Sequence, residues 1–190
     1  MHKSKTAFVS FFSIFPDTSG SASMTNSRFK NWPNKKKLFQ LSHLKKKNTK
    51  SICSIFIGKE TPMNKIFKLP IIILKIYNYL KNEKNKIVII EGSSWIFYTF
   101  IVLFALRVLL PKSKIIYISH NVECEIRKDF SNKFIYLLKK NLEKIVFKYS
   151  YLSTVVSTQD KKKIKKLYNL NTIIYPNAIS LNYKKNKNKI

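Results

Sequence analysis

Residues 115–123, which read IIYISHNVE, decide the fold of this chain. The first half of the stretch is a run of β-branched and aromatic residues, which is typical of a buried strand. The run stops at a polar cluster that contains His120, Asn121 and Glu123. In an open α/β sheet, ligands bind just beyond the carboxyl ends of the strands. The stretch therefore predicts a strand that brings a histidine, an amide and a carboxylate to a binding edge. A hydrogen-bonded histidine that only closes a strand end would give the same pattern.

Strands and helices are predicted to alternate on both sides of this stretch. The expected strands are 7–12, 38–42, 51–57, 86–90, 114–120, 151–156 and 172–175. The expected helices are 24–32, 65–80, 95–110 and 131–149, with a last helix opened by the capping sequence at 157–160. The apolar face expected for helix 131–149 consists of Leu138, Leu142, Ile145, Val146 and Tyr149. This alternation predicts a single α/β domain with a Rossmann-like, doubly wound, mainly parallel sheet and helices on both faces. The expected domain covers residues 6–180, and residues 181–190 are expected to form a lysine-rich tail.

The predicted helix 95–110 is the most hydrophobic segment of the chain. Fifteen uncharged residues separate Glu91 from Arg107, whereas a membrane-spanning helix needs about 20 apolar residues. We therefore expect a buried helix on one face of the sheet. The alternative is a helix that touches a membrane surface next to the lysine-rich segments.

The net charge of +28 has two possible meanings. A strongly basic protein can bind nucleic acid or an anionic membrane. Only Arg28, Arg107 and Arg127 are arginines among the 37 basic residues, so 34 are lysines. Bidentate recognition of phosphates and bases favours arginine. The lysine excess, together with abundant Asn and Ile, indicates an AT-rich coding sequence and a general attraction to membranes more than a nucleic-acid site.

Cysteines and histidines give no sign of a disulfide framework or a metal site. Cys53 and Cys124 are far apart, which is typical of free thiols in a reducing, cytosolic protein. The three histidines, His2, His43 and His120, lack ligand spacing. The basic N-terminus and the apolar residues 7–15 have some features of a signal peptide. Two serines and a following Pro-Asp pair favour a strand and a loop instead.

A second candidate site is the small-residue loop 16–23, between the first strand and the first helix. It contains Ser19, Gly20 and Ser21. Backbone N–H groups in such a loop can approach a phosphate or a sugar at the helix N-terminus. Most loops of this composition are only turns.

The motifs in this order resemble the N-terminal domain of the family-4 glycosyltransferases, which have the two-domain GT-B arrangement. The matching segments are 8–12 with 16–21, 117–123 with Arg127, 142–143, 155–157 and 175–179. The resemblance covers roughly residues 6–180. It implies that this domain holds a glycan or lipid-linked acceptor, while a second domain holds the nucleotide-sugar donor. No cofactor is implied.

The resemblance also implies roles for single residues. His120 would face the cleft as the catalytic residue and hydrogen-bond the transferred sugar. Asn121 and Glu123 would shape the edge of the pocket. Arg127 would pair with Glu123 across one helical turn.

The loop Ser19-Gly20-Ser21 would approach the donor phosphates or the sugar. The family commonly has two glycines here, and Ser19 stands in place of the first. A Cβ restricts positive φ and close backbone approach, which weakens the case for phosphate contact. Ala178 likewise replaces the glycine of the family's Pro-Asn-Gly turn.

The donor domain of the family has no counterpart in these 190 residues. The expectation is a hexosyltransferase-like chain that is inactive alone: a truncated gene product, a pseudogene remnant, or one subunit of a split enzyme. Its partners would then be an acceptor, a separate donor-domain chain and the anionic inner face of a membrane, with a cytoplasmic location.

Two other classes of function compete with this interpretation. One is a non-catalytic basic module that binds nucleic acid or anionic lipid through the lysine runs 35–37, 45–47 and 161–163. The other is a different Rossmann-type enzyme, but the chain contains neither Gly-x-Gly-x-x-Gly nor Gly-x-x-x-x-Gly-Lys. Among single residues, we expect Glu91 to be a charge at the start of a helix, and Tyr117 and Trp95 to belong to the core.

Overall fold

The computed structural model describes residues 4–15, 19–41, 64–92, 96–126 and 132–176. The strands are β1 (Lys5–Ser10), β2 (Lys35–Gln40), β3 (Lys86–Gly92), β4 (Lys114–Ser119), β5 (Leu152–Val155) and β6 (Ile173–Ile174). The helices are α1 (Gly20–Asn31), α3 (Asn64–Leu80), α4 (Ile96–Leu109), α5 (Glu123–Ile126), α6 (Lys133–Tyr149) and α7 (Thr158–Tyr168). The predicted strand 51–57 lies outside the described residues.

The strands form one parallel sheet in the order β2-β1-β3-β4-β5-β6. The chain moves outward from β1 to β2, then crosses back to β3 on the other side of β1. The strand order therefore reverses between β1 and β3, which is the point where doubly wound sheets bind their ligands. The predicted Rossmann-like, doubly wound class is confirmed.

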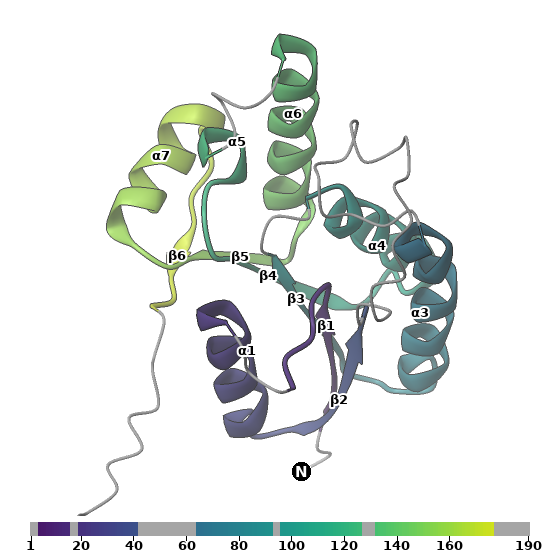
Figure 1. Cartoon of the computed structure of the whole chain (residues 1–190). Coiled ribbons are helices and arrows are strands. Elements are labelled where there is room, and N and C mark those ends of the chain that lie inside the picture. The colour runs from purple at the N-terminus through teal and green to yellow at the C-terminus, as the bar shows by residue number, and fades with distance from the viewer. Residues whose placement is uncertain (1–3, 16–18, 42–63, 93–95, 127–131, 177–190) are drawn as a thin grey trace, which may run out of the picture.

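Helices cover both faces of the sheet unequally (Figure 1). Helix α1 packs on one face, where Phe29 and Trp32 contact a small cluster of Phe8, Ile89 and Ile118. Helices α3, α4 and α6 pack on the opposite face over the main core. Alternate side chains of each central strand enter one core or the other, because the side-chain period of a strand is two.

Local chemistry explains where α1 begins. Ser19 has an extended backbone, with φ −140° and ψ 156°, and its Oγ accepts a hydrogen bond from the Ala22 backbone N–H at 3.2 Å. A serine at this position satisfies one of the free N–H groups of the first turn. The helix therefore starts at Gly20, four residues before the predicted start.

The predicted apolar face of α6 was partly wrong. The prediction placed Leu138 and Tyr149 toward the core, but both side chains are exposed. The buried side chains are Glu143, Val146 and Phe147. Glu143 accepts hydrogen bonds from backbone N–H groups at the start of α5, and this turns the face that carries it inward.

Helix α4 packs on the sheet as predicted. Its buried side chains are Ile96, Tyr98, Thr99, Val102, Leu103 and Leu106. The opposite side of the helix leaves Phe104 and Val108 largely exposed. Within the described residues, every helix falls short of the length and apolar character needed to cross a bilayer.

Candidate functional site

The candidate site lies at the carboxyl edge of the sheet, where the strand order reverses. Parallel pairing brings Glu91 of β3 level with Ser10 of β1 and Ile118 of β4. Gly92 follows, and the Tyr117 ring occupies the space where a Cβ at this position would lie. The end of β3 is thus held tightly between its neighbours, and the side chain of Glu91 is fully buried.

Arg28 of α1 is the first partner of Glu91. Its Nη1 donates to Glu91 Oε2 at 2.9 Å, and the guanidinium is buried with the carboxylate. A buried charge is costly unless it is paired. The ion pair therefore makes a charged group tolerable at this position and connects α1 to the end of β3.

His120 is the second partner of Glu91. It follows β4 directly, and its Nε2 lies 2.7 Å from the same oxygen, Glu91 Oε2. Because a carboxylate only accepts hydrogen bonds, Nε2 carries the proton and Nδ1 is the acceptor in the neutral ring. Within the described residues, Nδ1 has no hydrogen-bond partner. The carboxylate thus orients the imidazole and leaves one ring nitrogen for another group.

The second carboxylate oxygen, Glu91 Oε1, is buried and lacks a hydrogen-bond partner among the described residues. Buried polar atoms are nearly always paired, and an unpaired one costs about 1–3 kcal/mol. A hydrogen-bond donor from a ligand or an ordered water would remove this cost. The described residues therefore leave one acceptor on Glu91 and one on the far side of the His120 ring without a hydrogen-bond donor.

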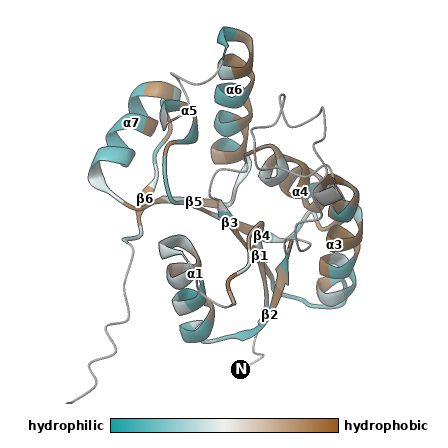
Figure 2. Cartoon of the chain, viewed as in Figure 1, coloured by the Kyte–Doolittle hydropathy of each residue, from teal (hydrophilic) through white to brown (hydrophobic). Residues whose placement is uncertain are grey.

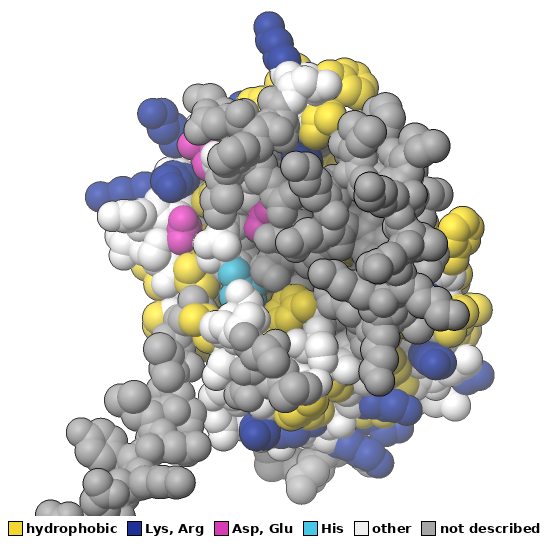
Figure 3. All heavy atoms as spheres, in the orientation of Figure 1, with side chains coloured by type: hydrophobic (Ala, Val, Ile, Leu, Met, Phe, Trp, Pro, Cys, Tyr) yellow, Lys and Arg dark blue, Asp and Glu magenta, His cyan; other side chains and the backbone are white. Residues whose placement is uncertain are grey.

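Tyr175, which directly follows β6, contributes an aromatic ring to the site. Its ring lies under the Arg28 guanidinium, with Cζ 5.1 Å from the ring centroid. Its backbone N–H donates to the Val155 carbonyl at 2.7 Å. The site is thus built from α1 and from the carboxyl ends of β3, β4 and β6. Figure 3 shows histidine, acidic and hydrophobic side chains toward the middle of one face of the molecule, with Lys and Arg around the periphery.

The predicted loop residues lie at the same edge but outside this cluster. Ser19 caps α1, and Gly20 is exposed, so that a Cβ added to it would meet no other group within 4 Å. Ser19 is extended, so it adopts a conformation that any residue can adopt. Among the described residues, neither these two nor Ser21 makes a hydrogen bond with His120. Arg28, two turns further along α1, makes the connection to the site instead.

Asn121 and Glu123 shape the turn after β4. The backbone carbonyl of Asn121 accepts a hydrogen bond from Ser119 Oγ at 2.6 Å. Glu123 is buried at the start of α5, and its backbone N–H donates to Glu143 Oε1 at 2.9 Å. The predicted partner of Glu123, Arg127, lies outside the described residues.

Glu143 holds this turn in place from α6. Its other oxygen, Oε2, accepts hydrogen bonds from the Cys124 backbone N–H at 3.3 Å and from the Tyr168 hydroxyl at 2.6 Å. Burial raises the pKa of the Glu143 carboxyl, and the hydrogen bonds oppose this effect. Burial also raises the pKa of the Cys124 thiol to about 12, so the thiol is protonated and unreactive at neutral pH. This network is structural support for the His120 turn.

Two site residues were not found from the sequence. The sequence predicts that Glu91 is a charge at the start of a helix, but it is a buried strand residue with two partners. The sequence pattern predicts no role for Arg28. The available signals were a carboxylate at the end of an apolar strand and a rare arginine in a lysine-rich chain. Tyr117 is buried as expected, whereas Trp95 lies outside the described residues.

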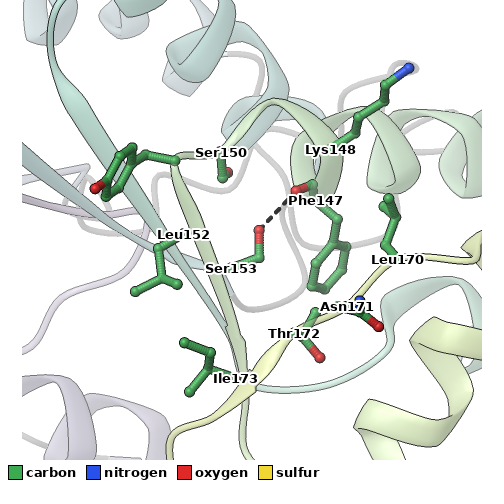
Figure 4. A pocket seen from close by; sticks show the side chains of 10 residues that line it. Phe147, Lys148, Ser150, Leu152, Ser153, Leu170, Asn171, Thr172 and Ile173 are labelled. Atoms are coloured by element: carbon green, nitrogen blue, oxygen red, sulfur yellow. Dashed lines mark hydrogen bonds between the residues drawn. The ribbon is translucent and has the colours of Figure 1, made fainter.

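A separate pocket lies at the opposite edge of the sheet (Figure 4). Its volume is about 300 Å³, and the amino ends of β5 and β6 line it together with the end of α6. Ser153 Oγ donates to the Phe147 carbonyl inside it at 2.9 Å. None of the predicted site residues lines this pocket.

No protein-family model matches this chain, and no curated protein matches it. Within the described residues, no group of three or more His, Cys, Asp or Glu side chains is arranged to hold a metal ion. The chemistry open to the site is therefore deduced from the Arg28–Glu91–His120 cluster itself.

Proposed function

We propose that this chain is the acceptor-side domain of a family-4 glycosyltransferase. It would bind a cell-surface glycan or a lipid-linked acceptor, while a donor-binding domain supplies the nucleotide sugar. The support is the doubly wound sheet and the polar cluster at its switch point. The fold alone hosts many functions, so the proposal depends on the cluster.

The observation that carries the proposal is a pair of hydrogen-bond acceptors that have no donor among the described residues. Among the described residues, Glu91 Oε1 is buried without a donor, and His120 Nε2 is committed to Glu91 Oε2, which leaves Nδ1 for a ligand. Sugars present several hydroxyl donors on one ring and can satisfy both acceptors together. A proton accepted at Nδ1 would create an imidazolium, and the Glu91 carboxylate would stabilise it.

One domain forms only one wall of such a site. Transfer requires two substrates that are aligned in a closed site with little water. The carboxyl edge supplies residues from α1, β3 and β4 on one side. A donor-binding domain, in the same chain or in another, would supply the other side.

The chain is also proposed to act at an anionic membrane surface on the cytoplasmic side. Its net charge of +28 attracts anionic lipids. A lipid-linked acceptor would then be concentrated at the surface where the protein binds.

Glycoside binding tests the site. We expect saturation-transfer difference NMR to detect binding of one or more members of a panel of methyl glycosides of hexoses, 6-deoxyhexoses, N-acetylhexosamines and uronic acids. Glu91→Gln and His120→Ala should each weaken binding about 10- to 100-fold, because each removes a hydrogen bond that involves a charged or strongly polar acceptor. Glu83→Gln is the matched control, because Glu83 pairs with Lys5 at the far edge of the sheet. It should bind as the parent does.

Thermal unfolding would verify that each variant is folded. The absence of any glycoside signal, combined with nucleic-acid binding that falls steeply with salt, would replace the proposal with the basic-module alternative. Glycoside binding that survives both site substitutions would remove Glu91 and His120 from the site.

A further inference from the structure

Helix α3 exposes a stripe of large hydrophobic side chains. Phe67, Ile71 and Leu74 are 71%, 53% and 54% exposed. Their spacing of four and three residues places them on one side of the helix. Leu69 and Ile76, which are buried, lie on the side that packs on the core. The exposed stripe is therefore additional to the packing that holds α3 on the sheet.

The neighbouring helices repeat this feature. On α4, Phe104 and Val108 are 60% and 67% exposed. On α6, Phe134, Leu137 and Leu138 are exposed in the first two turns. Helix α4 contacts both α3 and α6, and Figure 2 shows hydrophobic segments of α3 and α4 on the same side of the molecule. We call the outward side of α3, α4 and α6 the three-helix face.

The exposed charged residues of this face are all positively charged. Helices α3 and α4 contain no Asp or Glu, and the single acidic residue of α6, Glu143, is fully buried. Lysines accompany the hydrophobic stripes, with Lys75 exposed on α3 and Lys133 and Lys144 exposed on α6. An apolar surface with flanking cations and no exposed anion is typical of a surface that binds anionic lipid.

The face is also oriented relative to the candidate site. Helices α3, α4 and α6 each end just before the amino end of a strand, so each begins at the carboxyl edge of the sheet. The exposed hydrophobic side chains of α3 and α6 lie in their first halves, apart from Leu74 and Tyr149. The exposed apolar side chains of α3 and α6 are therefore mostly near the edge that carries Glu91 and His120, whereas Phe104 and Val108 lie in the second half of α4, toward the opposite edge.

We infer that the three-helix face docks on an anionic lipid bilayer, with its phenylalanines among the acyl chains and its lysines at the lipid phosphates. This inference rests on the proposed membrane association and names the surface responsible for it. A protein partner fits the face less well, because protein interfaces are enriched in Arg and depleted of Lys, and the exposed cations on α3 and α6 are lysines. Arg107, the arginine of α4, donates to the backbone carbonyls of Tyr149 and Ser113.

Vesicle flotation tests the inference. The probe is a vesicle of phosphatidylcholine and phosphatidylglycerol in about a two-to-one ratio, with pure phosphatidylcholine for comparison. The parent protein should float with the anionic vesicles and much less with the neutral ones. The double variants Phe67→Glu with Ile71→Glu, and Phe134→Glu with Leu138→Glu, should each bind at least about tenfold more weakly, because each loses two inserting side chains.

The matched control is Tyr151→Glu with Ile173→Glu. These side chains are 61% and 54% exposed, but they lie at the opposite edge near β5 and β6. The control should bind vesicles within about twofold of the parent, since it makes the same change in charge away from the face. Equal loss in the control and the face variants would overturn the assignment of this face.

The other outcomes separate this inference from the proposed function. If the face variants bind vesicles as tightly as the parent, the three-helix face is not the lipid-binding surface, although membrane association still holds. A parent protein that floats with neither vesicle would refute membrane association itself. Light scattering that shows a parent oligomer and monomeric face variants would identify a second copy as the occupant and overturn the lipid assignment. Glycoside binding in lipid-free buffer should be unchanged in the face variants, and it reports on the Glu91 site alone.

Discussion

Two buried carboxylates stand near the same edge of the sheet and have different surroundings. Glu91 shares one oxygen between the Arg28 guanidinium and the His120 ring. Glu143 receives backbone N–H groups and the Tyr168 hydroxyl. Without a cation beside it among the described residues, burial dominates, and the pKa of Glu143 is raised. Under the proposed function Glu91 would bind a ligand, whereas Glu143 holds the turn after β4.

The raised pKa of Glu143 predicts how stability changes with pH. The folded state holds this proton more tightly than the unfolded state does. The contribution of the group to stability is therefore fully present below its ordinary pKa of 4.5 and is lost as the pH rises through the raised value. Urea unfolding of the parent and of Glu143→Gln should show the parent gaining stability relative to the variant as the pH falls from about 7 to about 4.5.

Glu125→Gln provides the comparison for that experiment. Glu125 lies nearby on α5 and is only half-buried, so its substitution controls for the loss of one carboxylate from this region. A parent that loses stability relative to Glu143→Gln on acidification would show that the carboxylate is the preferred form in the fold.

At the scale of elements, Ser157 shows a cap that the sequence predicted well. Its Oγ accepts from the Asp160 backbone N–H at 3.0 Å and donates to Asp160 Oδ2 at 2.6 Å. Helix α7 begins at the next residue. The polar pattern was sufficient because both partners lie within one turn, so no tertiary information was needed.

Removing this cap should cost about 1 kcal/mol of unfolding free energy, within a range of roughly 0.5–2 kcal/mol. The variant is Ser157→Ala, measured by urea unfolding at neutral pH. Ser23→Ala, at an exposed position inside α1, is the matched control. It should be neutral or slightly stabilising, because alanine has the higher helix propensity. A loss at Ser23 as large as that at Ser157 would argue against a specific capping role.

The elements themselves were largely predictable, and the site was predictable only in part. Strand runs and helical spacing are local signals, so the alternation predicted the parallel sheet. His120 was identified because it follows a strong strand directly. The Arg28–Glu91 pair joins residues that are 63 positions apart, and only the three-dimensional packing of α1 reveals it. The face of α6 was misjudged for a related reason, since a buried Glu143 does not look like a core residue.

At the scale of the whole molecule, the site and the three-helix face have a common geometry. The carboxyl edge holds the acceptors on Glu91 and His120. The hydrophobic halves of α3 and α6 begin at the same edge. A protein docked through this face would hold its site close to the lipid headgroups, where a lipid-linked acceptor presents its sugar.

One domain forms only one side of the proposed active site, and this leads to a prediction about catalysis by the 190-residue chain. We expect the purified chain to transfer no sugar from radiolabelled nucleotide sugars to a lipid or glycan acceptor, because one Rossmann-like unit cannot exclude water from both substrates. The same preparation should still bind glycosides through Glu91 and His120. Turnover by the parent that disappears in His120→Ala would show that the single domain is catalytically sufficient. Turnover that persists unchanged in His120→Ala would remove His120 from the proposed catalytic role.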